Sequence, residues 1–534
     1  MKTDGTQNEN LTDDRPAAAE NETVFLADKF ENYNLNAYKN DVCEYGLKRT
    51  WAGITRRVLD GETQNVFLNA ENFADLYEAG LALENKLLKK QSGQYFTPDD
   101  VAAVMADWFD GLEGENVCDA GCGTGRLILS YFKKIGFDET RKLISSGRLY
   151  LYDTDETALN VCKTIIALKY GKDLVDKINC VTQDFLDEKL TLPKNCKVIS
   201  NPPYSIINAI PKNWAKTEVT SCTKELYAAF MEKIITQSKA AVIITPYSFI
   251  GGNKFYALRK LMNARNGFIV SFDNVPGNIF CGKKHGIFNT NSANSVRAAI
   301  TVVTSRKDET GFKLSPLIRF KNSERKKLLE AKTLENFIYQ ENQVVSEADK
   351  KYYKCDKSLG GIWKAWRKKS RNTLADYLNN DGKYLISVPT TCRYYTTAFN
   401  GVLNRTGQTQ LRFADKDVFN YVFCLINSSF VYWYWRLYDG GITYPKGLLE
   451  SVPVFFDLLT DGDKKFFEQT AEEMIARAGE FIITKNNVGV QENIKYPAEY
   501  RNKINAKLLK ILGLDEDESV FEVLHAHSAF GGDN

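Results

Sequence analysis

The spacing of hydrophobic and polar positions divides this chain into segments of different character. Up to about Leu88 the sequence reads as helical, with few Gly or Pro breakers. Apolar runs of β-type residues then alternate with helical patterns, and from about Phe312 this rhythm is lost. We therefore predict a polar, disordered tail (1–22), a helical region (23–90), an α/β domain (91–311) and a second domain (312–534).

The α/β domain is predicted to contain seven strands. They are expected at 116–120, 148–153, 178–184, 197–200, 241–245, 268–272 and 297–304. Helical patterns such as 155–170 and 224–238 separate most of them, and this alternation is typical of a mostly parallel, doubly wound, Rossmann-like sheet. The last run lacks a clear helix before it, so we expect an antiparallel final strand.

Composition excludes several classes of protein. With 534 residues the chain is too long for one compact core, and a net charge of +3 gives no overall basic field, although a local basic face remains open. Three histidines and no C-x-x-C pair among 11 cysteines make a zinc site unexpected and fit reduced thiols in the cytoplasm. No apolar stretch is long enough for a membrane span, and the polar N-terminus lacks the apolar region of a signal peptide.

A glycine-rich turn follows the first predicted strand, in VCDAGCGTGRL (117–127). Gly121, Gly123 and Gly125 allow the backbone to approach a ligand closely, at the edge of the sheet where doubly wound folds bind ligands. A dinucleotide fingerprint requires Gly or Ala at position 126, where this chain has Arg126. The turn therefore suits a nucleoside carrying an amino acid better than a pyrophosphate.

Acidic residues lie at three successive strands. Asp119 precedes the glycine turn, Asp153 ends the second strand, and Asp184 ends the third, with Phe185 beside it. The Asp153 carboxylate can accept hydrogen bonds from both hydroxyls of a ribose. The Asp184 carboxylate can accept from the exocyclic amine of an adenine, with Phe185 against the face of the ring. For each Asp alone a helix N-cap is the better interpretation, but three acids together with the glycine turn favour ligand binding.

The fourth predicted strand ends in the tetrad Asn201-Pro202-Pro203-Tyr204. Asn201 offers a side-chain oxygen and Pro202 a backbone carbonyl, and proline contributes no competing donor, so the position is rich in acceptors. A structural turn after a strand is the alternative interpretation.

These elements, in this order, resemble S-adenosylmethionine-dependent amino-methyltransferases. A third motif, Phe96-Thr97-Pro98 in GQYFTPDDVAAVMADWF (93–109), narrows the similarity to gamma-class DNA adenine-N6 methyltransferases of restriction–modification systems. That family places this motif first, the glycine turn next, the tetrad later and a target-recognition domain last. The resemblance covers residues 85–310 well and the C-terminal part more loosely.

The resemblance implies a Rossmann-like catalytic domain (91–311), a C-terminal α/β target-recognition domain (312–534), S-adenosyl-L-methionine as cofactor and double-stranded DNA as substrate. Asn201, Pro202 and Tyr204 would act on a flipped adenine, with Phe280 as a second stacking ring. The implied cofactor contacts are Phe96, Thr97, Asp119, Gly121, Gly123, Asp153, Asp184 and Phe185. Acceptors on both N–H bonds of the amine would localise its lone pair, and Tyr204 would stack on the base, with no metal required.

Candidate DNA contacts lie in the second domain. The segment 350–372 alternates lysines and arginines with aromatic residues, and basic groups of this kind bind phosphates. The candidates are Lys364, Arg367, Lys368, Arg393, Arg405, Arg412 and Arg436. The alternative for 350–372 is a solvated face over buried aromatics, and we expect FVYWYW (430–435) to be core.

Other functions remain open at this point. The tetrad also occurs in methyltransferases that act on RNA adenine or protein glutamine, and a catalytically inactive DNA-specificity subunit is a further alternative. Only about ninety residues precede Phe96, with no convincing nuclease cluster, so a fused nuclease is not expected. The sequence does not choose between a solitary enzyme and one that works beside a separate nuclease or a larger defence system.

Overall fold

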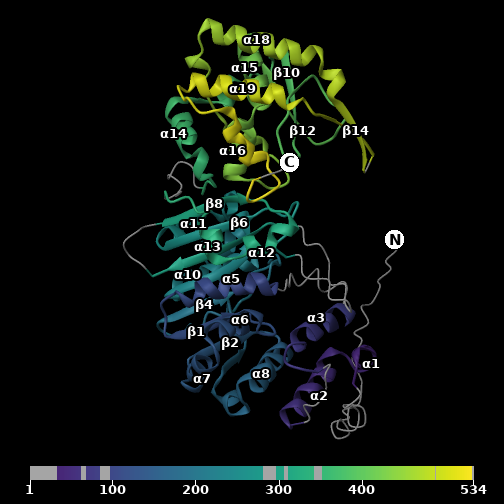
Figure 1. Ribbon diagram of the computed structural model, residues 1–534, viewed down its shortest axis with the longest axis vertical. Helices are drawn as coiled ribbons and strands as arrows, with labels where there is room; N and C mark the ends of the chain where they lie inside the picture. Colours follow the sequence, from purple (N-terminus) through teal and green to yellow (C-terminus); the bar gives the residue numbers. More distant parts are fainter. Residues whose placement is uncertain are drawn as a thin grey trace, which may run out of the picture.

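The computed structural model describes residues 33–61, 68–84, 97–280, 296–305, 311–341, 351–487 and 489–531. The expected tail (1–22) and Phe96 lie outside these ranges. Figure 1 shows three N-terminal helices beside a central α/β part, with a helix-rich C-terminal part above. The N-terminal helices are α1 (Leu35–Tyr45), α2 (Leu47–Leu59) and α3 (Phe73–Glu84).

The central sheet has eight strands in the order β3-β2-β1-β4-β5-β7-β6-β8. They are β1 (Asn116–Ala120), β2 (Leu149–Asp153), β3 (Asn179–Thr182), β4 (Cys196–Ser200), β5 (Ala240–Pro246), β6 (Asn266–Phe272), β7 (Ala298–Thr304) and β8 (Gly311–Ile318). Every neighbouring pair is parallel except those that β7 makes with β5 and β6. The doubly wound sheet and its antiparallel β7 are therefore confirmed.

The sequence analysis predicted seven strands and missed β8. This strand pairs with β6 at the edge of the sheet, across an irregularity between Ile269 and Ser271. Pro316 lies within it, and proline normally argues against a strand, although an edge position tolerates the missing donor. The sheet therefore continues to Ile318, beyond residue 311, where the α/β domain was expected to end.

Alternate residues of the strands face two helical layers. Val117 of β1 packs in one apolar core with helices on one face, and Cys118 packs in a second core on the other. The first layer comprises α5 (Asp99–Asp110), α6 (Arg126–Ile135), α7 (Phe137–Ser145) and α8 (Glu156–Tyr170), and the second α9 (Glu218–Thr223), α10 (Leu226–Gln237) and α11 (Tyr256–Asn263). Helices α12 (Arg325–Leu328) and α13 (Ala331–Glu335) follow β8.

The N-terminal helices pack on the outer face of α8, as Figure 1 shows. Trp51 of α2 and Phe73 of α3 share an apolar cluster with Ala158, Val161 and Ile165 of α8. The N-terminal helices therefore pack on the α/β part of this chain. The sequence alone did not show whether they would pack there or against a partner.

The C-terminal part combines three small sheets with helices. The three-stranded sheet has the order β11-β10-β12, with β10 (Tyr384–Pro389), β11 (Phe399–Asn400) and β12 (Gln408–Phe413). The two-stranded sheets pair β9 (Asn372–Thr373) with β13 (Pro453–Val454), and β14 (Ile482–Asn487) with β15 (Gly489–Ile494). Its helices are α14 (Gly360–Lys369), α15 (Lys416–Ile426), α16 (Ser429–Tyr438), α17 (Lys446–Glu450), α18 (Asp461–Ala476), α19 (Ala498–Ile511) and α20 (Glu522–His525). All of α16, including FVYWYW, is buried, which confirms that this stretch is core.

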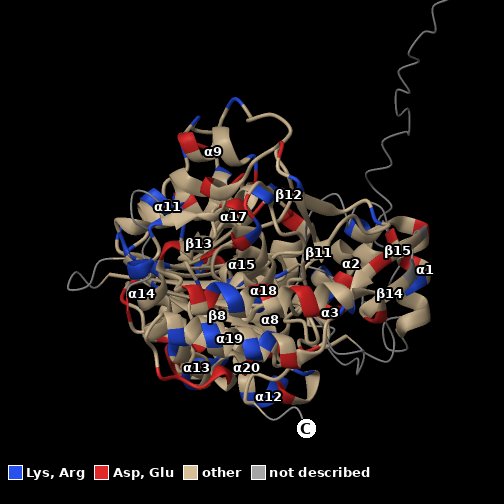
Figure 2. Cartoon of the chain, turned by 90° about the horizontal axis from the view of Figure 1, so that it is seen from above, with Lys and Arg blue, Asp and Glu red and all other residues tan. Residues whose placement is uncertain are grey.

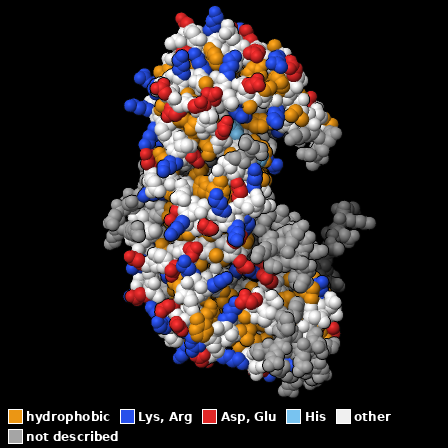
Figure 3. Space-filling view, viewed as in Figure 1, with side chains coloured by type: hydrophobic (Ala, Val, Ile, Leu, Met, Phe, Trp, Pro, Cys, Tyr) orange, Lys and Arg blue, Asp and Glu red, His pale blue; other side chains and the backbone are white. Residues whose placement is uncertain are grey.

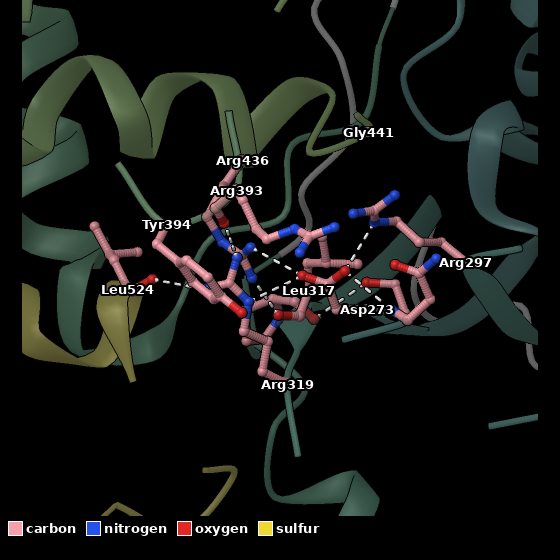
Figure 4. A network of polar contacts seen from close by, with 12 residues as sticks. Asp273, Arg297, Leu317, Arg319, Arg393, Tyr394, Arg436, Gly441 and Leu524 are labelled. Atoms are coloured by element: carbon pink, nitrogen blue, oxygen red, sulfur yellow. Dashed lines mark hydrogen bonds and ion pairs between the residues drawn. The ribbon is translucent and has the colours of Figure 1, made fainter. Parts of the chain in front are cut away.

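A buried charge cluster joins the C-terminal part to the central sheet (Figure 4). Asp273, which follows β6, is 1% exposed and accepts from Arg297, Arg319 and Arg436 at 2.8, 3.0 and 3.3 Å. Arg436 comes from α16 and also donates to the carbonyl of Leu317 in β8. One carboxylate therefore holds three guanidinium groups from both parts of the molecule.

No helix in the described ranges is both long and apolar enough to cross a membrane.

Candidate active site

The predicted motifs meet where the strand order reverses. β1 lies between β2 and β4, so the loops after β1 and β4 diverge at a crevice of the kind that binds ligands in doubly wound sheets. A cavity of about 460 Å³ lies there. Its lining includes Thr97, Gly121, Gly123, Asp153, Asp184, Phe185, Asn201 and Pro202.

The glycine turn has the backbone that the sequence predicted. Gly121, Gly123 and Gly125 have φ values of 74°, 52° and 84°, which favour glycine. A side chain at Gly123 would meet no atom within 4 Å and would enter open space beside the cavity, whereas one at Gly125 would collide with Cys162. Gly123 therefore leaves room for a ligand, and Gly125 serves the packing of the turn.

Acidic side chains line the cavity. Asp153 accepts from the N–H of Gly123 at 2.7 Å, so it fixes the turn, and burial raises its pKa. Asp184 accepts from Trp214 Nε1 at 2.6 Å. Asp155 is a third acid, and among the described lining residues Arg126 is the one basic side chain. The lining therefore favours a ligand with positive charge.

Asp119 does not line the cavity. Its side chain is fully buried in β1, and neither carboxylate oxygen has a hydrogen-bond partner among the described residues. Burial raises the pKa of Asp119 to about 8. The structure therefore places Asp119 behind the lining, and its expected ligand contact stays a prediction.

The tetrad lies at the rim of the cavity, directly after β4. The Asn201 side chain donates from Nδ2 to Thr97 Oγ1 at 2.9 Å, and its Oδ1 accepts from the Tyr204 hydroxyl at 2.8 Å. Pro202 is buried. The sequence analysis expected Thr97 at the cofactor, and the structure adds a contact between its hydroxyl and the Asn201 amide.

The two candidate stacking rings are neighbours. The Tyr204 and Phe280 ring centroids are 6.0 Å apart at an interplanar angle of 68°, and neither ring is among the cavity-lining residues. An edge-to-face pair leaves no slot for a base between the rings. Sandwiching a base requires one ring to turn, so the stacking roles of Tyr204 and Phe280 stay predictions.

The sequence did not identify a contribution from α3. Tyr77 and Leu81 line the cavity, and the Tyr77 hydroxyl donates to Asp155. Amphipathic spacing indicates that a helix is buried, but it does not say against which partner.

Comparison with known protein families shows to which family the chain belongs. The family described as N-6 DNA methylase matches residues 68–342, just over half of the sequence. The chain belongs to this family.

Curated relatives of the chain include proteins of restriction enzymes. The methylase subunit of the type I restriction enzyme MpnII from Mycoplasma pneumoniae is 24% identical over 292 residues, 49% of each chain. The type II restriction enzyme and methyltransferase RM.BcgI from Heyndrickxia coagulans is 25% identical over 175 residues, 32% of this chain and 26% of the relative. The chain thus spans at most about half the length of these relatives.

Solved structures give weaker likenesses. The DrdV–DNA complex has a TM-score of 0.44 at 15% identity, over 69% of this chain and 43% of that one. The methyltransferase subunit of a type I restriction–modification system from Streptococcus thermophilus has a TM-score of 0.33 at 16% identity, over 52% and 67%.

The candidate DNA contacts are not gathered on one surface. Lys364, Arg367 and Lys368 are exposed on α14, where Figure 2 shows a basic patch, whereas exposed Arg412 on β12 lies on the other side of the C-terminal part (Figures 1 and 2). Lys364 is paired with Glu341 at 2.5 Å. Arg393 is exposed in the loop after β10.

Two of the candidate arginines are engaged in contacts within the protein. Arg436 is buried and bound to Asp273, which removes it from the DNA-binding set. Arg405 donates to Asn493 and to the carbonyl of Gly407. The aromatic residues Tyr352, Trp363 and Trp366 are also buried, so in this segment they belong to the core, whereas Lys364, Arg367 and Lys368 face solvent.

A substitution at Thr97 separates its two roles. Thr97→Val keeps the shape but removes the acceptor for Asn201 Nδ2, so we expect the rate constant of methyl transfer to fall about tenfold, the worth of one hydrogen bond. If Thr97 acts only through Asn201, cofactor affinity stays within about twofold of wild type, since no other contact changes. Single-turnover kinetics and calorimetric titration of the cofactor measure the two quantities.

Thr97→Ser is the matched control, because it retains the hydroxyl and is expected to keep the wild-type rate. A large loss of cofactor affinity in Thr97→Val at an unchanged rate would instead assign Thr97 to the cofactor alone.

Proposed function

We propose that this chain is a site-specific DNA methyltransferase that transfers the methyl group of S-adenosylmethionine to the N6 amine of an adenine flipped out of duplex DNA. The observation that carries the proposal is the oriented Asn201 amide at the rim of the cavity, beside the glycine turn. Family membership supports the reaction class. An intact tetrad and an open cavity argue against a catalytically inactive subunit.

The lining of the cavity fits S-adenosylmethionine better than a dinucleotide. The cofactor has a sulfonium and an ammonium against one carboxylate, whereas a pyrophosphate is an anion. Asp153, Asp155 and Asp184 line the cavity, and the single basic lining group, Arg126, is itself bound to carboxylates. Acidic surroundings favour a cation and penalise an anion. Phe185 lies beside Asp184 in the lining, where it offers a face to the adenine ring.

The chain's own groups would orient and activate the amine. When bound, the cofactor supplies a methyl group on positively charged sulfur. Asn201 Oδ1 and the Pro202 carbonyl oxygen each accept a hydrogen bond from one of the two N–H groups of the amine. This localises the nitrogen lone pair and stabilises the positive charge that develops on the nitrogen. Tyr204 presents its ring to the base and must share Asn201 Oδ1 with it. Holding the amine in line with the methyl group accounts for much of the rate.

We propose the C-terminal part as the DNA-binding domain. On the face drawn in Figure 3, basic and acidic side chains are interspersed, so phosphate contacts would come from local groups and not from a broad basic field. Exposed Arg393 and Arg412, with Lys364, Arg367 and Lys368 on α14, are the candidates. One relative is named as the methylase subunit of a restriction enzyme and another as a restriction enzyme and methyltransferase, so we also propose that this chain acts on DNA inside a restriction–modification system and, like the first, has a separate subunit as partner.

Modification-sensitive sequencing of DNA from a methylation-free bacterial host tests the proposal. We expect methylated adenine in one short sequence motif when the wild type is expressed, and none with Asn201→Ala. Modified cytosine would contradict the assignment of the base. Unmodified DNA together with labelled methyl groups on RNA or protein would contradict the assignment of the substrate.

A further inference from the structure

Arg126 is the residue at which the glycine turn departs from the dinucleotide fingerprint, and the structure ties it to the N-terminal helices. Its Nη2 contacts Asp75 Oδ1 and Glu78 Oε1 of α3, both at 2.7 Å. Its Nη1 contacts Asp99 Oδ1 at the start of α5, at 2.5 Å. One guanidinium at the start of α6 therefore joins three segments around the cavity.

These contacts are partly shielded from water. The side chains of Arg126 and Glu78 are 18% and 12% exposed, whereas that of Asp99 is 72% exposed. A shielded ion pair is screened less by salt than an exposed one. The planar, forked guanidinium holds its donors in a fixed geometry, so Arg126 binds both carboxylates of α3 and Asp99 with one rigid group. The pair with Glu78 is thus the best placed of the three to fix α3.

The same helix forms a wall of the cavity. Tyr77 and Leu81 line it, and Tyr77 is bonded to Asp155, which caps α8 through the N–H groups of Thr157 and Ala158. A ligand that fills the cavity therefore contacts the glycine turn and α3 together.

We infer that α3 is part of the cofactor site and that Arg126 is a positioning residue that holds it there, so that the N-terminal helices set cofactor affinity. This inference rests on the proposed function for the identity of the ligand. A ligand that binds only when α3 is packed beside the cavity stabilises that packing. If the packing of α3 is weakened, the apparent affinity for the ligand falls in proportion to the fraction of molecules in which α3 is in place.

The first test removes the cation from full-length protein. Arg126→Met removes the guanidinium that Asp75 and Glu78 share, and we expect the Kd of S-adenosylmethionine to rise at least tenfold in calorimetric titration. Hydrogen exchange in 73–84 is expected to accelerate without cofactor and to slow again at saturating cofactor. Arg141→Met is the matched control, because Arg141 on α7 pairs with Asp173 in the turn after α8, outside the cavity lining, and its loss is expected to leave Kd unchanged.

The second test keeps the arginine and removes its partners. Asp75→Asn with Glu78→Gln preserves shape and removes both charged partners on α3 while Arg126 keeps its contact with Asp99, and we expect the same rise in Kd and the same faster exchange in α3. If instead the double variant binds as tightly as wild type while Arg126→Met binds weakly, Arg126 contacts the cofactor directly and the role of α3 is overturned.

The remaining outcomes are also decisive. Wild-type Kd in both variants overturns the inference and leaves the proposed function intact. Wild-type protein that does not bind S-adenosylmethionine at all contradicts the proposed function itself, because both tests start from measurable binding by the wild type.

Discussion

Asn201→Ala is expected to lower the rate constant of methyl transfer by about 10²- to 10³-fold, the loss typical of removing one charge-stabilising group from an active site. Cofactor affinity is expected to stay within about twofold, because the acidic lining and the glycine turn are unchanged. The acceptor contributes mainly as positive charge develops on the amine, so its loss falls on the rate and not on binding of the cofactor.

The orientation of the amide makes the prediction sharper. Nδ2 is used by Thr97, which leaves Oδ1 as the atom that can face the amine. Asn201→Asp keeps an acceptor and adds negative charge, and the Thr97 hydroxyl can then act as donor. We therefore expect Asn201→Asp to retain more activity than Asn201→Ala.

Single-turnover transfer of labelled methyl groups, on the duplex motif found by sequencing, measures these rates. Asn253→Ala is a suitable control, since Asn253 is an exposed asparagine in a short turn of the same domain. Loss of less than tenfold in Asn201→Ala would show that its oxygen is not an essential acceptor.

Local patterns predicted the framework of the site well. Each of the seven expected apolar runs is a strand, and the parallel order brings the turn after β1 next to the tetrad after β4. The juxtaposition of Gly123 and Asn201 follows from that order alone, because carboxyl ends of parallel strands share one edge.

The missed features depend on contacts distant in sequence. β8 contains Pro316 and is recognisable only from its pairing with β6. The bond between Thr97 and Asn201 spans 104 residues, and that between Arg126 and Glu78 spans 48. Trp363 and Trp366 stand among lysines, yet only the packing of α14 against the C-terminal core decides that they face inward.

Asp273→Ala is expected to destabilise the protein by about 3–5 kcal/mol, the loss typical of removing one partner from a buried ion pair. The three guanidinium groups would then repel one another at the junction of the C-terminal part and the sheet. Thermal unfolding followed by calorimetry should show a midpoint several degrees lower. Asp173→Asn, at the exposed Arg141 pair, serves as control and should leave the midpoint unchanged.

The effect of pH on this cluster has a definite sign. Burial acts to raise the pKa of Asp273, but the charges of Arg436, Arg297 and Arg319 outweigh it and hold that pKa below its ordinary value. A depressed pKa in the folded state means that the carboxylate stabilises the fold above the unfolded pKa of about 3.9 and loses this contribution as pH falls below it. The difference in midpoint between wild type and Asp273→Ala should therefore shrink in acid.

The ratio of one carboxylate to three cations makes the cluster asymmetric. Arg297→Met leaves Asp273 still bound to Arg319 and Arg436, so it removes one surplus cation and should cost much less than Asp273→Ala. The reverse ranking would mean that hydrogen bonding by the guanidinium groups, and not neutralisation of their charge, holds the two parts together. Equal midpoints for wild type and Asp273→Ala would contradict a stabilising role altogether. On the expected ranking, Asp273 is the residue that lets three arginines remain buried between the catalytic sheet and the C-terminal part.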